Sequence, residues 1–228
     1  MSAKPLKKSA ARKRILIVDD HAVLREGLMT QINREPDLEV CGEAINVTEA
    51  LVAVEKLNPD LVLADINLPG RNGLELIRDV RVLRPDLPTL VLSMHDEEVF
   101  AERVLRAGGR GYVSKHQSGH ALIAAIRHVL SGQIYLSDRV STQLLDRLSG
   151  AGNLQRLRTL SPVDLLTDRE LEVFTLIGQA KETKVISRNL GMSAKTVEAH
   201  RASIKRKLKL KTGPELTRHA VLWVEAVR

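Results

Sequence analysis

The chain has 228 residues, of which 43% are hydrophobic and 28% charged, a balance typical of a soluble globular protein with one large or two small domains. No apolar run approaches the roughly 18 residues that a bilayer-spanning helix needs, and the basic first residues lack the apolar stretch of a signal peptide. The single cysteine, Cys41, excludes an internal disulfide framework and a cysteine-based zinc site. We therefore expect a cytoplasmic protein.

Charge is unevenly distributed along the chain. Residues 1–14 contain six basic residues and no acidic one, residues 15–140 contain 13 basic and 19 acidic residues, and residues 141–228 contain 16 basic and nine acidic residues. An acidic first half joined to a basic second half predicts two domains, with nucleic-acid or membrane contact in the second. We interpret residues 1–14 as a basic, solvated and disordered arm.

Strand-like and helix-like segments alternate through the first half of the chain. Strands are predicted at residues 15–19, 38–44, 60–64, 89–93 and 111–115. Helices are predicted at residues 22–33, 47–57, 74–83, 97–108 and 120–132, with glycines near the ends of the last two. This order indicates an α/β doubly wound, flavodoxin-like domain with a five-stranded parallel sheet, which we assign to residues 15–137.

The second half begins with a change of pattern. Residues 138–165 contain a short amphipathic piece and the stretch SGAGN, and we interpret them as a linker. Residues 166–228 read as helix only. Thr167 and Glu170 form a capping box, the turn GMS separates helices at 183–190 and 194–208, and a final helix follows Gly213 and Pro214. Two short helices joined by a glycine-containing turn predict a small all-α helix-turn-helix domain.

Polar residues stand at the predicted strand ends of the first domain. Asp19 and Asp20 follow the first strand, Asp65 the third, Ser93 the fourth and Lys115 the fifth. The carboxyl ends of parallel strands share one edge of the sheet, where doubly wound proteins bind ligands. Three close carboxylates need a cation, or protons, to coexist, and oxygen ligands suit Mg²⁺. The sequence therefore predicts a magnesium site in which Asp65 can accept a phosphoryl group.

Four motifs at these positions resemble the receiver domain of two-component response regulators. They are VDDH at 18–21, the D-x-x-L-P-G-x-x-G run at 65–73, LS at 92–93 and GYVSK at 111–115. The resemblance implies that Asp65 is the phosphoacceptor. It implies direct Mg²⁺ ligands from Asp20 and Asp65, a water-mediated one from Asp19, and the backbone carbonyl of Asn67.

The same resemblance implies that Ser93 and Lys115 bind phosphoryl oxygens and that Tyr112 changes rotamer with the phosphorylation state. An alternative for Tyr112 is an ordinary half-buried tyrosine of an edge strand. His21 and His95 flank the site, and we interpret both as rim residues without a catalytic part.

The helix predicted at 194–208 has one apolar face, formed by Val197, Ile204 and Leu208, and an opposite stripe of bases around small residues. The stripe contains Lys195, Glu198, Ala199, Ala202, Lys205, Arg206 and Lys209. Small side chains permit the helix to approach a major groove closely, while its basic side chains reach the DNA phosphates. Ala199 and Ala202 could contact thymine methyl groups, and Glu198 could accept from cytosine N4.

This region resembles the DNA-binding domain of NarL/FixJ, or LuxR-type, regulators, most specifically in TVEAHR followed by KRKL. The stretch VIS at 185–187 and Ala180 depart from the family pattern. The resemblance implies a DNA-contacting set of Lys184, Ser193, Lys195, Thr196, Glu198, Ala199, Arg201, Ala202, Lys205 and Arg206. It also implies a homodimer through residues 214–227, the alternative being that the apolar residues of this helix all pack inward.

Together these features predict a transcription factor with double-stranded DNA and a sensor histidine kinase as partners, phosphorylated on Asp65 with Mg²⁺, and no membrane partner. One alternative is a phosphate-independent dimerisation module joined to a DNA reader. Another is an aspartyl-phosphate hydrolase, but such enzymes carry their nucleophile on the first strand with a second acid two residues on. Here the first strand ends in adjacent aspartates, which argues against an enzyme.

Overall fold

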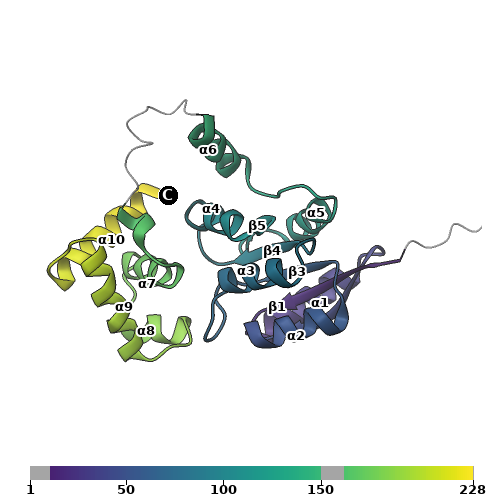
Figure 1. The fold of residues 1–228 in the computed structure, drawn as a ribbon, viewed down its shortest axis with the longest axis horizontal. Helices are drawn as coiled ribbons and strands as arrows, with labels where there is room; N and C mark the ends of the chain where they lie inside the picture. The colour runs from purple at the N-terminus through teal and green to yellow at the C-terminus, as the bar shows by residue number, and fades with distance from the viewer. Residues whose placement is uncertain (1–10, 150–161, 228) are drawn as a thin grey trace, which may run out of the picture.

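Five parallel strands in the order β2-β1-β3-β4-β5 form the sheet of the first domain in a computed structural model, which describes residues 11–149 and 162–227 (Figure 1). The strands are β1 (Lys13–Val18), β2 (Leu38–Ala44), β3 (Leu61–Ala64), β4 (Thr89–Ser93) and β5 (Gly111–Ser114). The helices between and after them are α1 (Ala22–Asn33), α2 (Val47–Leu57), α3 (Gly73–Leu83), α4 (Glu97–Ala107) and α5 (Gly119–Leu130). The predicted doubly wound fold is confirmed.

The two faces of the sheet are covered by different helices. Apolar residues of α1 and α5 pack with one set of strand side chains, and those of α2, α3 and α4 pack with the other. Buried apolar runs such as Leu61–Ala64, in which every residue is covered, follow from this two-sided cover. Helix starts are set locally: Asn46, Asn72, Asp96 and Ser118 each cap the following helix with a side-chain oxygen.

The remaining elements are helical. They are α6 (Asp138–Ser149), a short 3₁₀ turn η1 (Pro162–Leu165), α7 (Asp168–Gly178), α8 (Thr183–Asn189), α9 (Ala194–Lys207) and α10 (Gly213–Val227). The predicted capping box at Thr167 and Glu170 is present, and Ser193 caps α9 as expected. None of the helices in the described ranges has the length and apolarity to cross a membrane.

Most element boundaries shift by one or two residues, and two differences change the predicted domain boundaries. Strand β1 begins at Lys13, whose N–H donates to the carbonyl of Asp37, so the end of the predicted arm belongs to the sheet. The predicted linker contains α6 and η1, and α6 contacts α4 through a Gln143–Glu98 hydrogen bond. The rest of the arm at 1–10 and most of SGAGN lie outside the described residues.

The helical domain packs against the receiver-like domain with α7 facing α3 and α4 (Figure 1). One cluster of buried apolar side chains continues from Ile77 and Phe100 in the first domain to Leu171 and Phe174 in α7. The two domains therefore share part of their core.

Candidate functional site

The carboxyl ends of the strands bring an amine and two carboxylates into contact. Lys115, just after β5, places its Nζ 2.6 Å from Oδ2 of Asp19 and 2.5 Å from Oδ2 of Asp65. Only 3% of either carboxylate side chain and 7% of the lysine side chain are exposed. The strand-end residues Asp19, Asp65 and Lys115 thus meet as the sequence predicted.

Burial and charge act in opposite directions within this group. Burial raises the pKa of Asp65, and the ammonium of Lys115 opposes that rise. Burial alone would lower the pKa of Lys115, but the carboxylates of Asp65 and Asp19 outweigh it and raise the lysine pKa. The amine therefore stays charged beside Asp65.

A set of possible metal donors lies on the same rim. One ligand atom each from Asp19, Asp20, His21 and Asp65 lies within 4.8 Å of the others. Three of the four are carboxylates, and this hard-oxygen set fits Mg²⁺. The backbone N–H of Asn67 donates to Oδ1 of Asp65 at 3.2 Å, so this residue lies beside the donor set, and its role as a carbonyl ligand stays a prediction.

Ser93 and Tyr112 are both buried next to this rim. Ser93 ends β4 and is fully buried, and its hydroxyl accepts from the N–H of His95. Tyr112 is 1% exposed and donates its hydroxyl to the carbonyl of His95 at 2.8 Å. The description of Tyr112 as half-buried is therefore wrong, because α4 and the β4–α4 loop cover its strand. Its role as a switch stays a prediction.

A contact between two loops was not visible in the sequence. Nε2 of His95 lies 2.9 Å from Oδ1 of Asn67, and the imidazole lies against the ring of Phe100 with centroids 4.7 Å apart. Burial lowers the pKa of His95 to about 4, so the imidazole is neutral at physiological pH. No local pattern joins these residues, since 28 positions separate His95 from Asn67.

The β3–α3 loop and helices α3 and α4 hold the helical domain through polar contacts. Asp168, at the start of α7, lies 2.6 Å from Nη2 of Arg78 in α3 and 2.9 Å from Nη1 of Arg103 in α4. Arg103 also donates to the carbonyls of Leu166 and Val163. Because Asp168 is 14% exposed at its side chain, both guanidinium groups bind a mostly covered carboxylate.

A second carboxylate of α7 is buried completely at this contact. Glu172 accepts from Nη1 of Arg169 at 2.6 Å and from the side-chain amide of Asn72, across the domain boundary, at 3.3 Å. Burial raises the pKa of Glu172 to about 7, against the opposing effect of Arg169. The turn before α9 also lies close to the β3–α3 loop, since a Cβ built on Gly191 would lie 3.6 Å from Pro69.

Helix α9 keeps its predicted stripe uncovered. Val197, Ile204 and Leu208 are buried, as predicted for the inward face. The exposed or partly exposed residues include the predicted DNA-contacting set: Lys184, Ser193, Lys195, Thr196, Glu198, Ala199, Arg201, Ala202, Lys205 and Arg206. Their contact with DNA stays a prediction.

Helix α10 divides its apolar residues between the core and the surface. Leu216, Ala220 and Val224 are buried, and Trp223 lies against Phe174 at a centroid distance of 5.5 Å. Leu222 remains 55% exposed. The alternative in which every apolar residue packs inward is therefore wrong for Leu222, and the dimer contact stays a prediction.

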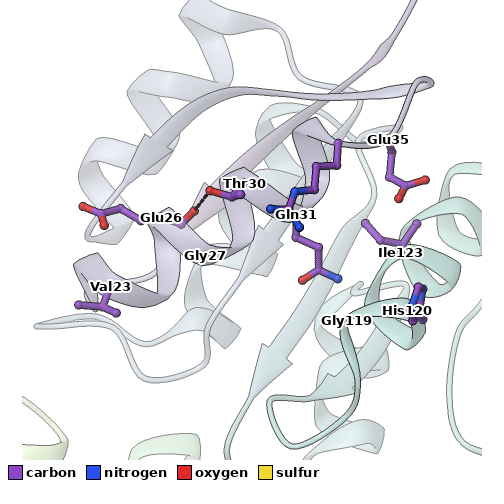
Figure 2. A pocket seen from close by; sticks show the side chains of 10 residues that line it. Val23, Glu26, Gly27, Thr30, Gln31, Glu35, Gly119, His120 and Ile123 are labelled. Carbon is purple, nitrogen blue, oxygen red and sulfur yellow. Dashed lines mark hydrogen bonds between the residues drawn. The ribbon is translucent and has the colours of Figure 1, made fainter.

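A separate groove lies between α1 and α5 (Figure 2). It is lined by Val23, Glu26, Gly27, Thr30, Gln31, Arg34, Glu35, Gly119, His120 and Ile123. Its walls are the exposed sides of two helices, and none of the predicted phosphoacceptor-site residues lines it. The acidic rim is thus separate from this groove.

Two family models match the chain. Residues 15–127 match the response regulator receiver domain, and residues 164–220 match bacterial regulatory proteins of the luxR family. The oxygen regulatory protein NreC of Staphylococcus aureus strain JH9 is 36% identical over 209 residues, which cover 91% of this chain and 96% of NreC.

Solved structures resemble the chain as well. A LuxR-family two-component response regulator from Aurantimonas sp. SI85-9A1 matches 61% of this chain and 99% of its own, with 32% identity and a TM-score of 0.57. RcsB from Salmonella typhimurium matches 92% of this chain and 98% of its own, with a TM-score of 0.62. Its 22% identity supports the fold alone.

Proposed function

The chain belongs to the two-component response regulators that join a receiver to a LuxR-type DNA-binding domain, and we propose that phosphorylation of Asp65 controls its binding to DNA. The observation that carries the proposal is the ion-paired group at the rim, where Lys115 contacts Asp65 and Asp19 at 2.5 and 2.6 Å. A sensor histidine kinase is the phosphodonor we infer from the receiver domain. Because the protein must reach both its kinase and the DNA, we infer that it works in the cytoplasm.

The transfer we propose is a displacement at phosphorus. An Oδ–P bond forms at Asp65 while the N–P bond of the kinase phosphohistidine breaks, and the imidazole leaves with the bonding electron pair. Asp19, Asp20 and Asp65 would hold Mg²⁺, which when bound neutralises charge on the phosphoryl oxygens. Lys115 and Ser93 bind the remaining oxygens, so Lys115 exchanges a carboxylate partner for a phosphoryl oxygen.

The β3–α3 loop offers a route from this site to the DNA-binding domain. Gly73, the first residue of α3, packs so closely on the phosphoacceptor backbone that a Cβ there would lie 2.1 Å from the carbonyl oxygen of Asp65. The same loop supplies Asn72, which donates to Glu172, and Pro69, which lies next to Gly191 of the helical domain. We propose that a phosphoryl group on Asp65 shifts this loop and weakens the docking of α7.

DNA recognition in this proposal uses α9 in a major groove. The basic side chains of Lys195, Lys205 and Arg206 contact phosphates, while Ala199 and Ala202 approach the edges of the DNA bases. Dimers form on phosphorylation through residues 214–227, where Leu222 is exposed, and present two copies of α9 to half-sites about 10 base pairs apart. A structural relative, RcsB from Salmonella enterica, was solved on the P1flhDC promoter with the phosphomimetic BeF₃⁻.

The test compares DNA affinity with and without Mg²⁺ and beryllofluoride in wild type and in Asp65→Asn. DNA fragments selected from random sequence provide the ligand, and intact mass spectrometry after acetyl phosphate treatment reports phosphorylation. We expect the wild type to gain DNA affinity with the mimic and the Asp65→Asn variant to show neither gain nor phosphate incorporation. Phosphate retained by that variant would refute the assignment of Asp65. Equal affinities in the wild type would favour a phosphate-independent dimerisation module.

A further inference from the structure

We propose that His21 is a nitrogen ligand of the divalent ion at the acidic rim, so that this receiver favours ions that accept imidazole more than an all-oxygen site would. The inference deepens the proposed function and depends on it only in assuming that an ion binds there. From the sequence, His21 was interpreted only as a rim residue without a catalytic part.

The backbone of His21 holds its imidazole over the carboxylates. His21 occupies the position before α1, where a side-chain oxygen commonly caps the helix, but its side chain makes no capping hydrogen bond. Its N–H donates to Oδ1 of Asp19 at 2.8 Å. Its Nδ1 lies 3.1 Å from that oxygen and 2.8 Å from Oδ1 of Asp20. The imidazole is therefore directed at the acids instead of at the helix.

The donor spacing suits a single ion. Opposite ligands of an octahedral ion with bonds of about 2.1 Å lie about 4.2 Å apart. The four donor atoms from Asp19, Asp20, His21 and Asp65 all lie within 4.8 Å of one another, so small side-chain movements would close them around an ion. An imidazole nitrogen in such a set favours Co²⁺ or Ni²⁺ relative to Mg²⁺.

Asp19 keeps the imidazole and the lysine on different oxygens. Its Oδ2 contacts Nζ of Lys115, whereas its Oδ1 faces His21. An ion on the Oδ1 side would therefore leave Lys115 in place for the phosphoryl group. The imidazole is 66% exposed, so its Nε2 can carry the ring proton in water while Nδ1 offers a lone pair.

A competing arrangement uses the same contacts. A protonated His21 would form ion pairs with Asp19 and Asp20 and would have no lone pair at Nδ1. The two arrangements differ in one observable, which is direct bonding of nitrogen to the ion.

Pulsed EPR of the full-length protein loaded with Mn²⁺ measures that bonding through ¹⁴N hyperfine coupling. We expect coupling from one directly bound imidazole nitrogen in the wild type and its loss in His21→Gln, which still binds Mn²⁺ through the carboxylates. The matched control is His116→Gln, an exposed histidine next to Lys115, which should keep the coupling. Mn²⁺ bound by the wild type without nitrogen coupling would overturn the assignment of His21.

Calorimetric titration gives a second readout. The ratio of Co²⁺ to Mg²⁺ affinity should fall at least several-fold in His21→Gln and stay unchanged in His116→Gln. An unchanged ratio in both variants would also overturn the inference. The variant Asp20→Asn separates this failure from failure of the proposed function. If titration detects no divalent-ion binding in the wild type, and Asp20→Asn gives the same result, the assignment of a metal site to the acidic rim is itself wrong.

Discussion

The receiver and the DNA-binding domain use buried charge in different ways. In the receiver, Lys115 joins two carboxylates from separate strands at the carboxyl edge of the sheet. In α7, Glu170 and Glu172 stand two residues apart yet differ widely in pKa. Burial opposes the change at Glu170, but hydrogen bonds from Lys207, Ser203 and Thr167 lower its pKa to about 2. Burial beneath the receiver raises that of Glu172 to about 7.

The difference shows which charges belong to one domain and which depend on contact between two. Every named partner of Glu170 lies in the DNA-binding domain, whereas Glu172 accepts a hydrogen bond from Asn72, at the end of the loop that begins at the phosphoacceptor. A buried carboxylate with partners in its own domain stabilises that domain. A carboxylate buried across the domain boundary makes the docking of the two domains depend on pH.

Removing the central amine of the receiver should have the largest effect. Lys115→Met leaves Asp19 and Asp65 buried without their shared cation, so the free energy of unfolding should fall by about 3–5 kcal/mol. Urea denaturation followed by circular dichroism measures this change. Lys56→Met, at an exposed position in α2, should change stability by less than about 0.5 kcal/mol and serves as the control. A similar small loss for Lys115→Met would mean that the rim is more hydrated than its burial indicates.

Neutralising the carboxylate at the domain boundary should have a smaller effect, confined to docking. Asp168→Asn weakens two charge-assisted contacts, to Arg78 and Arg103, and should cost about 2 kcal/mol of docking free energy. Small-angle X-ray scattering should show a larger radius of gyration, and the variant should bind DNA more tightly without the phosphoryl mimic. Asp86→Asn, an exposed carboxylate of the receiver, should leave both unchanged. Wild-type dimensions for Asp168→Asn would show that apolar packing alone holds the domains.

The pKa of Glu172 predicts how docking depends on pH. Its value is raised from 4.5 to about 7 in the docked form, so docking takes up a proton between these values. The stabilisation of docking is complete below about pH 4.5 and is lost as the pH rises through about 7. The charged or polar neighbours of Glu172 are Arg169, Asn72 and Asp168. Scattering from pH 5 to 8 should therefore show expansion with rising pH.

The variant Glu172→Gln should remove that dependence, because glutamine has no proton to lose. Glu170 behaves in the opposite sense: its lowered pKa stabilises the DNA-binding domain above about pH 4.5, and this stability is lost only as the pH falls toward 2. Expansion of the wild type below pH 5 but not above it would place the sensitive group elsewhere.

The smallest effect should come from a single surface base of α9. Lys205→Ala removes one phosphate contact, so affinity should fall evenly across DNA sequences and the slope of log K against log salt should decrease by about one. Fluorescence anisotropy over a salt series measures both quantities. A change in base preference at one position would show instead that Lys205 contacts a base edge.

Local patterns were enough to predict most of the fold. Alternating strand and helix segments predicted the parallel sheet, and the capping residues Thr167 and Ser193 predicted where α7 and α9 begin, because these signals act within one turn of chain. The strand-end positions of Asp19, Asp65 and Lys115 predicted their meeting, since parallel strands end on one edge. The alternative of a half-buried Tyr112 was wrong, because α4 covers the tyrosine and that cover does not follow from its own strand.

The contacts that govern docking were decided only by tertiary structure. Asp168 and Arg78 are 90 residues apart, Asn72 and Glu172 are 100 apart, and neither pair carries a spacing that a sequence pattern could show. The sequence by itself determined the two domains, the residues on the acidic rim and the exposed stripe of α9. Packing of one domain on the other decided that Glu172 is buried and Asp168 mostly covered, because their burial depends on surfaces that distant segments bring together.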